Sequence, residues 1–133
     1  MTTQGHGEQR LGKILVVDDE ALLRTMICDG LQAAGHRVVA ASSGEEALLA
    51  AKAERPACIL LDIMMPDLDG YDTCAALKAD PETASIPVIL ISATTDVRVV
   101  ERAENVGATA VLPKPIPMEQ LQHAVALAVN PPA

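Results

Sequence analysis

Acidic, hydroxyl and amino side chains stand at the ends of four short apolar segments of this sequence. The segments are Ile14-Leu-Val-Val, Ile59-Leu-Leu, Val88-Ile-Leu-Ile and Val111-Leu. The polar residues at or just beyond their ends are Asp18, Asp19, Asp62, Ser92 and Lys114. If the four segments are strands whose ends meet, then three carboxylates, a hydroxyl and an ammonium group lie in one pocket.

Such a pocket suits the transfer of a phosphoryl group. Three carboxylates repel one another and raise one another's pKa, and a hard divalent cation relieves that repulsion. Mg²⁺ prefers a few carboxylates together with phosphate oxygens and water. The Lys114 ammonium and the Ser92 hydroxyl add a second positive charge and a hydrogen-bond donor, which complete a clamp for the transferring group. A carboxylate also acts as a nucleophile in some enzymes, which gives an aspartyl-phosphate.

Two kinds of segment alternate from residue 13 onward. The expected strands are Lys13–Val17, Arg37–Ala41, Ala57–Leu61, Val88–Ser92 and Ala110–Leu112. The expected helices are Ala21–Ala34, a segment opened by the capping box Ser43-x-x-Glu46 and ended before Pro56, Gly70–Lys78, Asp96–Val106, and a last helix from Pro117 to about Val129. Apolar spacing, capping residues, Gly35 and Gly107 set these bounds.

Five strands alternating with five helices predict right-handed crossovers and a parallel sheet covered on both faces. In such a sheet the carboxyl ends of all strands share one edge, where ligands bind near the topological switch point. Half of the residues are hydrophobic, yet the chain has no Phe, no Trp and one Tyr. The core is therefore expected to be aliphatic, which suits a buried parallel sheet.

Composition excludes several classes of function. The 133 residues suit a single domain. A formal net charge of −8, with ten dispersed basic residues, argues against direct binding of nucleic acid. Cys28, Cys58 and Cys74 lack metal-ligand spacing and are expected to be buried free thiols in a reducing cytosol. No apolar run approaches the roughly 18 residues of a membrane span, and the polar segment Met1–Arg10 lacks a signal-peptide core. We expect a cytoplasmic protein.

Taken singly, these polar residues have ordinary structural explanations. An Asp that follows a strand is more often a helix cap than a ligand, Ser92 alone suggests a turn, and Lys114 alone suggests a surface residue. The combination of acids, hydroxyl and lysine at four strand ends favours the functional interpretation.

These same residues make the sequence resemble the receiver domains of response regulators, from Lys13 to Val129. The matching motifs are Val17-Asp18-Asp19-Glu20, Leu61-Asp62-Ile63-Met64-Met65-Pro66, Gly70, Ser92-Ala93 and Lys114-Pro115. The resemblance implies a flavodoxin-like, doubly wound, five-stranded parallel sheet of order 2-1-3-4-5 with five helices. Residues 13–129 would form this domain, with a flexible tail at 1–12 and a tail or linker start at 130–133.

The resemblance also implies a role for each site residue. Asp62 would be the phosphoacceptor, and Asp19 would bind Mg²⁺ directly while Asp18 holds it largely through water. The backbone carbonyl of Met64 would be a further metal ligand. Lys114 and Ser92 would contact the phosphoryl group. The family further implies a cis peptide bond between Lys114 and Pro115.

One departure from the family concerns the readout of phosphorylation. The family usually has an aromatic residue three positions before the lysine, but this sequence has Val111 there. Pro113, just before Lys114, is also unusual and is expected to stiffen the strand end. Neither change touches the phosphorylation chemistry.

The partners implied are a histidine kinase or a histidine phosphotransfer protein as donor, and a downstream protein that binds the face of the fourth helix, fifth strand and fifth helix. A monomer or a phosphorylation-dependent dimer is expected. The sequence leaves open whether the chain works alone or continues into a longer protein.

Three other functions fit the sequence less well. A phosphohydrolase of the haloacid dehalogenase type needs an Asp two residues after the nucleophile, where this chain has Met64. An FMN carrier is disfavoured because Asp18-Asp19-Glu20 would repel the cofactor phosphate. A degenerate receiver that only binds partners stays open because of Val111, although the full acid set counts against it.

Overall fold

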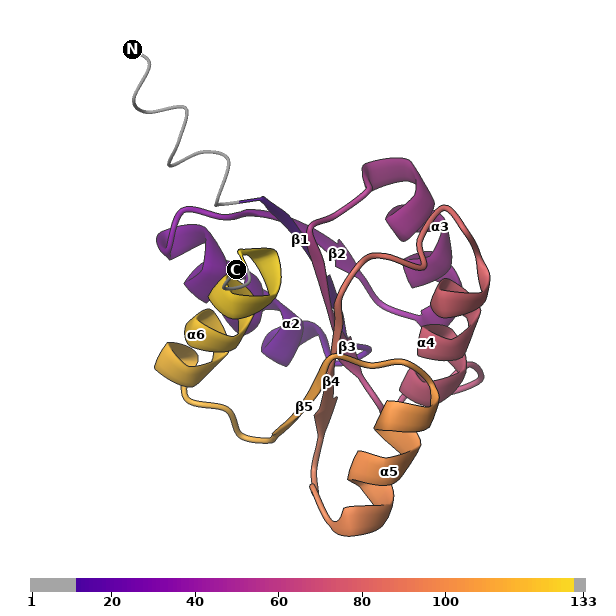
Figure 1. Cartoon of the computed structure of the whole chain (residues 1–133). Coiled ribbons are helices and arrows are strands. Elements are labelled where there is room, and N and C mark those ends of the chain that lie inside the picture. The colour runs from indigo at the N-terminus through magenta and orange to yellow at the C-terminus, as the bar shows by residue number, and fades with distance from the viewer. Residues whose placement is uncertain (1–11, 131–133) are drawn as a thin grey trace.

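The computed structural model describes residues 12–130 and shows a parallel sheet between two layers of helices (Figure 1). In chain order the elements are β1 (Lys13–Val17), α2 (Ala21–Ala33), β2 (Arg37–Ala41), α3 (Gly44–Glu54), β3 (Cys58–Asp62), α4 (Gly70–Ala79), β4 (Val88–Ser92), α5 (Val97–Asn105), β5 (Ala110–Pro113) and α6 (Met118–Val129). The strand order is β2-β1-β3-β4-β5 with every pair parallel. The predicted flavodoxin-like fold is confirmed.

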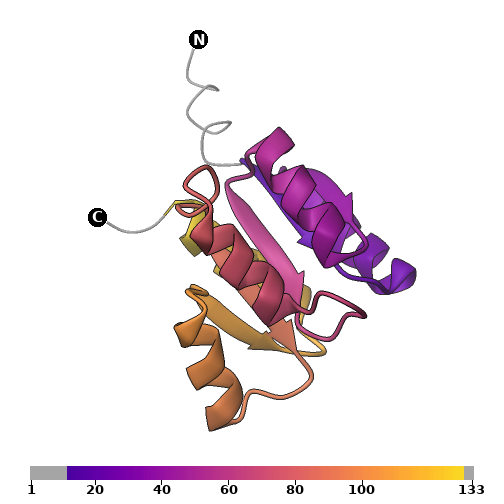
Figure 2. The ribbon, with the colours of Figure 1, turned by 90° about the vertical axis from the view of Figure 1, so that its right-hand side faces the viewer.

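Two aliphatic cores lie on opposite faces of the sheet. Helices α2 and α6 cover one face, and α3, α4 and α5 cover the other (Figures 1 and 2). Successive side chains of a strand point to opposite faces, so Leu15 and Leu61 pack under α3, α4 and α5, whereas Val16 and Leu60 pack under α2 and α6. Strands β3 and β4 are buried along their whole length, as the continuous apolar sequences predict.

The ends of several elements differ from the sequence prediction by a residue. Strand β3 begins at Cys58 and includes Asp62, and β5 extends to Pro113. The end of β3 is fixed by pairing, because Asp62 lies opposite Ile91 of β4 in the register. Pro117 precedes the first residue of α6 as its N-cap and is not part of the first turn.

The capping box of α3 has a different partner from the one expected. Ser43 Oγ accepts a hydrogen bond from the backbone N–H of Glu46 at 3.1 Å, as predicted. The Glu46 carboxylate, however, accepts from the backbone N–H of Ser42, one residue before the cap. Two hydrogen bonds therefore stabilise the start of α3. The one accepted by the Glu46 side chain comes from Ser42 and not from the N-cap residue Ser43, as a capping box would have it.

Not all of the apolar stripe predicted on α2 is buried. Ile27 and Leu31 enter the core, but Leu22 and Met26 have 75% and 57% of their surface exposed. These two residues are separated by one helical turn and thus share the solvent-facing side of α2. The helical period was correct, but the apolar face is wider than the core needs.

The start of α4 packs directly on the backbone of Asp62. A Cβ atom placed at Gly70 would lie 2.6 Å from the carbonyl oxygen of Asp62 and 2.6 Å from the Cα of Ile63. The Gly70 N–H also donates to the carbonyl of Ile63 at 2.9 Å. Only a residue without a side chain fits this contact, so Gly70 sets the distance between α4 and the end of β3.

We predict that Gly70→Ala lowers the free energy of unfolding by about 1–3 kcal/mol, because the added methyl group must displace backbone atoms. Urea denaturation measures this change. Gly30→Ala in α2 is the matched control, since the added methyl group meets only the flexible side chain of Met118. It should change stability by less than about 1 kcal/mol, with the gain in helix propensity offsetting the movement of Met118. Equal losses in the two variants would contradict this account.

Candidate functional site

The predicted polar residues meet at the carboxyl edge of the sheet. Asp18 follows β1, Asp62 and Ser92 are the last residues of β3 and β4, and Lys114 follows β5. The last strand is joined to its neighbour here by the Lys114 N–H, which donates to the carbonyl of Ser92 at 2.8 Å. Parallel pairing thus brings together residues from four separate parts of the chain.

Three carboxylates form a cluster at this edge. Asp18, Asp19 and Asp62 each offer an oxygen, and these oxygens all lie within 4.8 Å of one another. Asp18 and Asp62 are each only 2% exposed, whereas Asp19 faces solvent. The cluster therefore has a buried side and an open side, and the open side permits a ligand to enter.

Asp18 is held in place by contacts of its backbone and its carboxylate. Its N–H donates to the carbonyl of Ala41 at 3.2 Å, and its Oδ1 accepts from the N–H of Glu20 at 2.9 Å. The guanidinium of Arg24, on α2, donates from Nη1 to the Asp18 carbonyl at 2.6 Å. Arg24 could not be predicted from the sequence, because its contact is with a backbone carbonyl and no motif marks it.

Lys114 forms an ion pair with Asp62 in which Nζ lies 2.9 Å from Oδ1. Burial raises the pKa of Asp62, the Lys114 ammonium counteracts that rise, and Asp19 adds to it, leaving the pKa above its usual value. Burial alone would lower the pKa of Lys114, but the adjacent Asp62, with Asp18 and Glu20, outweighs burial and raises it. The lysine is thus held as a cation against the carboxylate.

The pKa of Asp18 is also raised, chiefly by burial, which the hydrogen bond from Glu20 opposes and the charge of Asp62 reinforces. Two buried carboxylates with raised pKa values therefore lie within one cluster. Ionising either carboxylate in the folded protein costs free energy, because that carboxylate loses water and lies near the charge of the other.

The cluster has the chemistry that a hard divalent cation requires. All its donors are oxygens, and it carries more negative charge than Lys114 alone offsets. Asp62 Oδ1 is buried and, apart from the ion pair with Lys114, has no hydrogen-bond partner. Mg²⁺ prefers such oxygen donors and keeps several waters, for which the exposed side at Asp19 leaves room. The residues present fit a magnesium ion.

Ser92 and Met64 flank the cluster. Ser92 is 5% exposed, and its Oγ accepts from the N–H of Thr94 at 3.2 Å, at the start of the loop that leads to α5. The Met64 side chain is 72% exposed, so it contributes little to the core. The peptide bond between Lys114 and Pro115 is cis, as the family resemblance implied.

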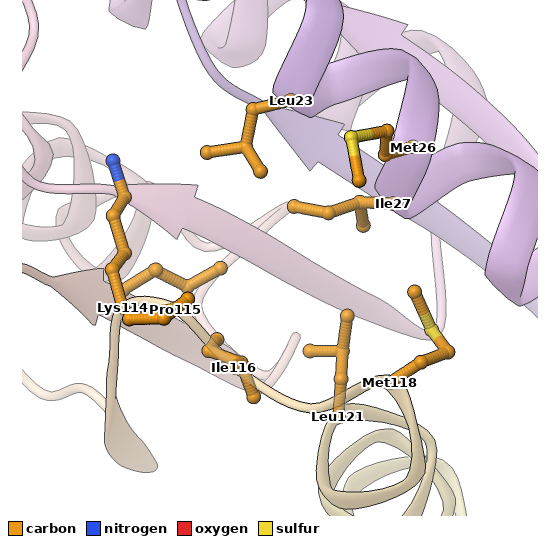
Figure 3. A pocket seen from close by; sticks show the side chains of 9 residues that line it. Leu23, Met26, Ile27, Lys114, Pro115, Ile116, Met118 and Leu121 are labelled. Carbon is orange, nitrogen blue, oxygen red and sulfur yellow. The ribbon is translucent and has the colours of Figure 1, made fainter.

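An apolar hollow of about 390 Å³ lies beside Lys114, between α2 and the segment from β5 to α6. Its lining comprises Leu23, Met26, Ile27, Ile91, Lys114, Pro115, Ile116, Met118 and Leu121. The ammonium end of Lys114 points away from the other lining side chains, so the lysine offers its aliphatic stem to the hollow (Figure 3). The hollow could not be predicted from the sequence, because it depends on how α2 packs against the segment from β5 to α6.

Within residues 12–130, none of the helices has the length and apolar character needed to cross a membrane.

Cys58 and Cys74 are buried, as expected for core thiols, whereas Cys28 on α2 is only partly buried. Burial raises the pKa of the Cys58 thiol to about 12, so this thiol is protonated at neutral pH.

The sequence matches a known protein family along most of its length. Residues 14–126 match the family model of the response regulator receiver domain. A probable transcriptional regulator, ycf27, of Pyropia yezoensis is 38% identical over 118 residues, which are 89% of this chain and 47% of that protein. The chain spans about half the length of this and other curated relatives that it matches.

Two solved structures show the same architecture. The chemotaxis protein CheY4 of Vibrio cholerae is 31% identical, with a TM-score of 0.83 over 86% of this chain and 96% of that one. The receiver domain of the sensor histidine kinase PA1611 from Pseudomonas aeruginosa is 28% identical, with a TM-score of 0.82 over 89% of this chain and 97% of that one. That structure has a magnesium ion coordinated in its active-site cleft.

We predict that Asp18→Asn raises the free energy of unfolding of the metal-free protein at pH 7. The amide oxygen still accepts from Glu20, while the buried charge that burial and Asp62 disfavour is removed. Thermal unfolding in EDTA measures the change. Adding Mg²⁺ should then stabilise the wild-type protein more than the variant, because the variant has lost a charged donor.

The same variant tests the dependence of stability on pH. The folded-state pKa of Asp18 lies above its ordinary value of 3.8, so the folded state binds a proton more readily than the unfolded state. In EDTA, lowering the pH from neutral toward 3.8 should therefore stabilise the wild type relative to Asp18→Asn. A stability difference between the two proteins that stays constant with pH would contradict the raised pKa.

Proposed function

Because this chain belongs to the response regulator receiver domains of two-component systems, we propose that it is switched by a phosphoryl group carried on Asp62. The donor is a histidine kinase or a histidine phosphotransfer protein. The observation that supports this most strongly is the placement of Asp62, a buried carboxylate paired with Lys114 at 2.9 Å and clustered with Asp18 and Asp19.

The proposed transfer uses Asp62 as the nucleophile. One carboxylate oxygen forms a bond to phosphorus while the bond from phosphorus to the donor breaks, and the leaving group keeps that electron pair. For a phosphohistidine donor, an imidazole nitrogen receives the pair. The product is an acyl phosphate on Asp62, which adds roughly −1.5 to −2 charges by analogy with other phosphorylated residues.

Asp18, Asp19, Asp62 and the backbone carbonyl of Met64 would hold Mg²⁺, in line with the fit of the oxygen cluster described above. When bound, Mg²⁺ neutralises charge that develops on the phosphoryl oxygens during transfer. The remaining contributions come from the protein itself. Asp18 is positioned by Glu20 and Arg24, so its carboxylate is oriented before any ligand arrives.

Lys114 and Ser92 would bind the phosphoryl group once it is attached. The Lys114 ammonium already faces Asp62 and needs only a small shift to reach a phosphoryl oxygen on that residue. Ser92 ends the neighbouring strand and, in the present structure, accepts a hydrogen bond from Thr94. When its hydroxyl donates to the phosphoryl group, the loop that begins at Thr94 is drawn toward the site.

The output face that we propose comprises α5, β5 and α6. Val97 and Val100 on α5 have 69% and 38% of their surface exposed, and Leu127 on α6 has 48%. Exposed aliphatic residues on a small domain suit a protein partner. Curated relatives are named as transcriptional regulators, so the partner is either a DNA-binding segment or a separate protein, engaged by a monomer or a phosphorylation-dependent dimer.

As a receiver domain, the chain is a signalling domain and not an enzyme of the usual kind. Met64 stands two residues after Asp62, where a hydrolase would need an acid–base group, so we expect only slow self-phosphorylation from small donors and slow self-dephosphorylation.

The receiver itself would comprise residues 13–129. The proposed tails at 1–12 and 130–133 lie almost wholly outside the described residues. We place the protein in the cytoplasm, where free thiols persist.

We predict that acetyl phosphate with Mg²⁺ adds one phosphoryl group to the wild-type protein and none to Asp62→Asn, as intact-mass spectrometry will show. Asp67→Asn is the matched control, because Asp67 is an exposed acid in the following loop. Its φ of 65° is also one that Asn adopts readily. EDTA should abolish the labelling.

Two results would count against the proposal. Labelling that persists in Asp62→Asn would move the acceptor to another residue. A folded wild-type protein that takes up no phosphoryl group from acetyl phosphate or from a phosphorylated phosphotransfer protein would instead favour a degenerate receiver that only binds partners.

A further inference from the structure

The ring of the chain's single tyrosine contacts a cation on a different helix. The sequence has no Phe or Trp beside Tyr71, and the Cζ atom of Arg102 lies 4.2 Å from the centroid of the Tyr71 ring. Tyr71 is 8% exposed in the first turn of α4, and Arg102 is in the last turn of α5. The two helices lie side by side on one face of the sheet (Figure 2). The contact has the geometry of a cation–π interaction.

The ring is closely tied to the phosphoacceptor. Tyr71 follows Gly70, whose N–H donates to the carbonyl of Ile63 at 2.9 Å and whose Cα has no room for a side chain against the Asp62 carbonyl. Tyr71 is also packed in the aliphatic core on this face of the sheet. The position of the ring is therefore fixed relative to the backbone of Asp62.

The guanidinium, in contrast, is on a helix with few buried residues, although Val99 is partly buried against the core. Of the nine residues in α5, all of which the structure describes, Ala103 alone is fully buried, whereas five of the ten residues in α4 are buried. Helix α5 starts shortly after Ser92, with Asp96 as its N-cap, and Ser92 Oγ holds the intervening loop through the N–H of Thr94. A helix with so few buried contacts shifts at low free-energy cost.

We propose that the Tyr71–Arg102 contact holds α5 in its unmodified position and weakens when Asp62 carries a phosphoryl group. This inference rests on the proposed function. Movement of Ser92 toward the phosphoryl group draws the loop and the start of α5 with it, while Gly70 keeps Tyr71 in place. The guanidinium then moves off the ring, and α5 with its exposed Val97 and Val100 takes up a new position.

Thermodynamic linkage determines whether loss of the Tyr71–Arg102 contact raises or lowers the affinity for a phosphoryl mimic. If the contact favours the unmodified state, removing it must favour the modified state by the same free energy. Cation–π contacts at partly exposed sites correspond to about a two- to five-fold change in an equilibrium constant. Arg102→Met should therefore bind the phosphoryl mimic beryllium fluoride, in Mg²⁺, about two- to five-fold more tightly than the wild type.

The experiment compares the wild type with three variants by isothermal titration calorimetry and by tyrosine emission. Arg102→Met removes the cation and keeps an unbranched apolar side chain, and Arg102→Lys restores a cation. Arg98→Met is the matched control, since the Arg98 side chain is on the same helix and is 88% exposed. With no Trp in the chain, all the protein emission comes from Tyr71. Arg102 is itself exposed, so these variants are expected to fold.

We expect wild-type emission to change on addition of beryllium fluoride, and the change to be lost in Arg102→Met and partly restored in Arg102→Lys. Arg98→Met should behave as the wild type. Intact-mass spectrometry after treatment with acetyl phosphate gives an independent measure of acceptor chemistry. If Asp62 is labelled but Arg102→Met matches Arg98→Met in affinity and emission, the inference is overturned while the proposed function survives. If Asp62 takes up no label, both are overturned.

Discussion

The burial of negative charge at one edge of an aliphatic sheet is the constraint on which the rest of this structure depends. Asp18 and Asp62 are almost inaccessible to water at the end of strands whose other side chains are mostly aliphatic. Lys114 and the backbone N–H of Glu20 offset part of that charge. The negative charge at this edge is thus only partly neutralised. A divalent cation, alone or together with a phosphoryl group, would neutralise the remainder.

The alternating strands and helices could be predicted from the sequence, because local signals agreed with one another, whereas the strand order followed from the resemblance to receiver domains. Apolar runs such as Cys58-Ile-Leu-Leu have the length and continuity of buried parallel strands, and Ser43, Gly35 and Gly107 mark helix ends. What failed were details that depend on neighbours. The inclusion of Asp62 in β3 follows from its pairing with β4, and Met26 is exposed because it lies on the solvent-facing side of α2. Neither the strand pairing nor the orientation of the helix on the sheet is contained in the local sequence.

The site was predictable to the extent that strand ends identify it. Asp18, Asp19, Asp62 and Lys114 converge because parallel strands share an edge, and the structure brings them together as the pattern indicates. Contacts made through the backbone were not predictable. Arg24 donates to the backbone carbonyl of Asp18. Gly70 can pack against the Asp62 carbonyl because it has no Cβ atom. The stacking of Arg102 on Tyr71 joins two helices whose relative placement only tertiary packing determines.

The two cores on opposite faces of the sheet have a consequence for how substitutions combine. Neighbouring strand residues such as Leu60 and Leu61 belong to different cores, so they share backbone but few packing partners. Substitutions in separate, non-contacting clusters combine nearly additively. Substitutions in the layer of α2 and α6 and substitutions in the layer of α3, α4 and α5 are therefore expected to change the free energy of unfolding nearly independently. One layer can be altered while the packing of the other, and the acidic edge between them, stays unchanged.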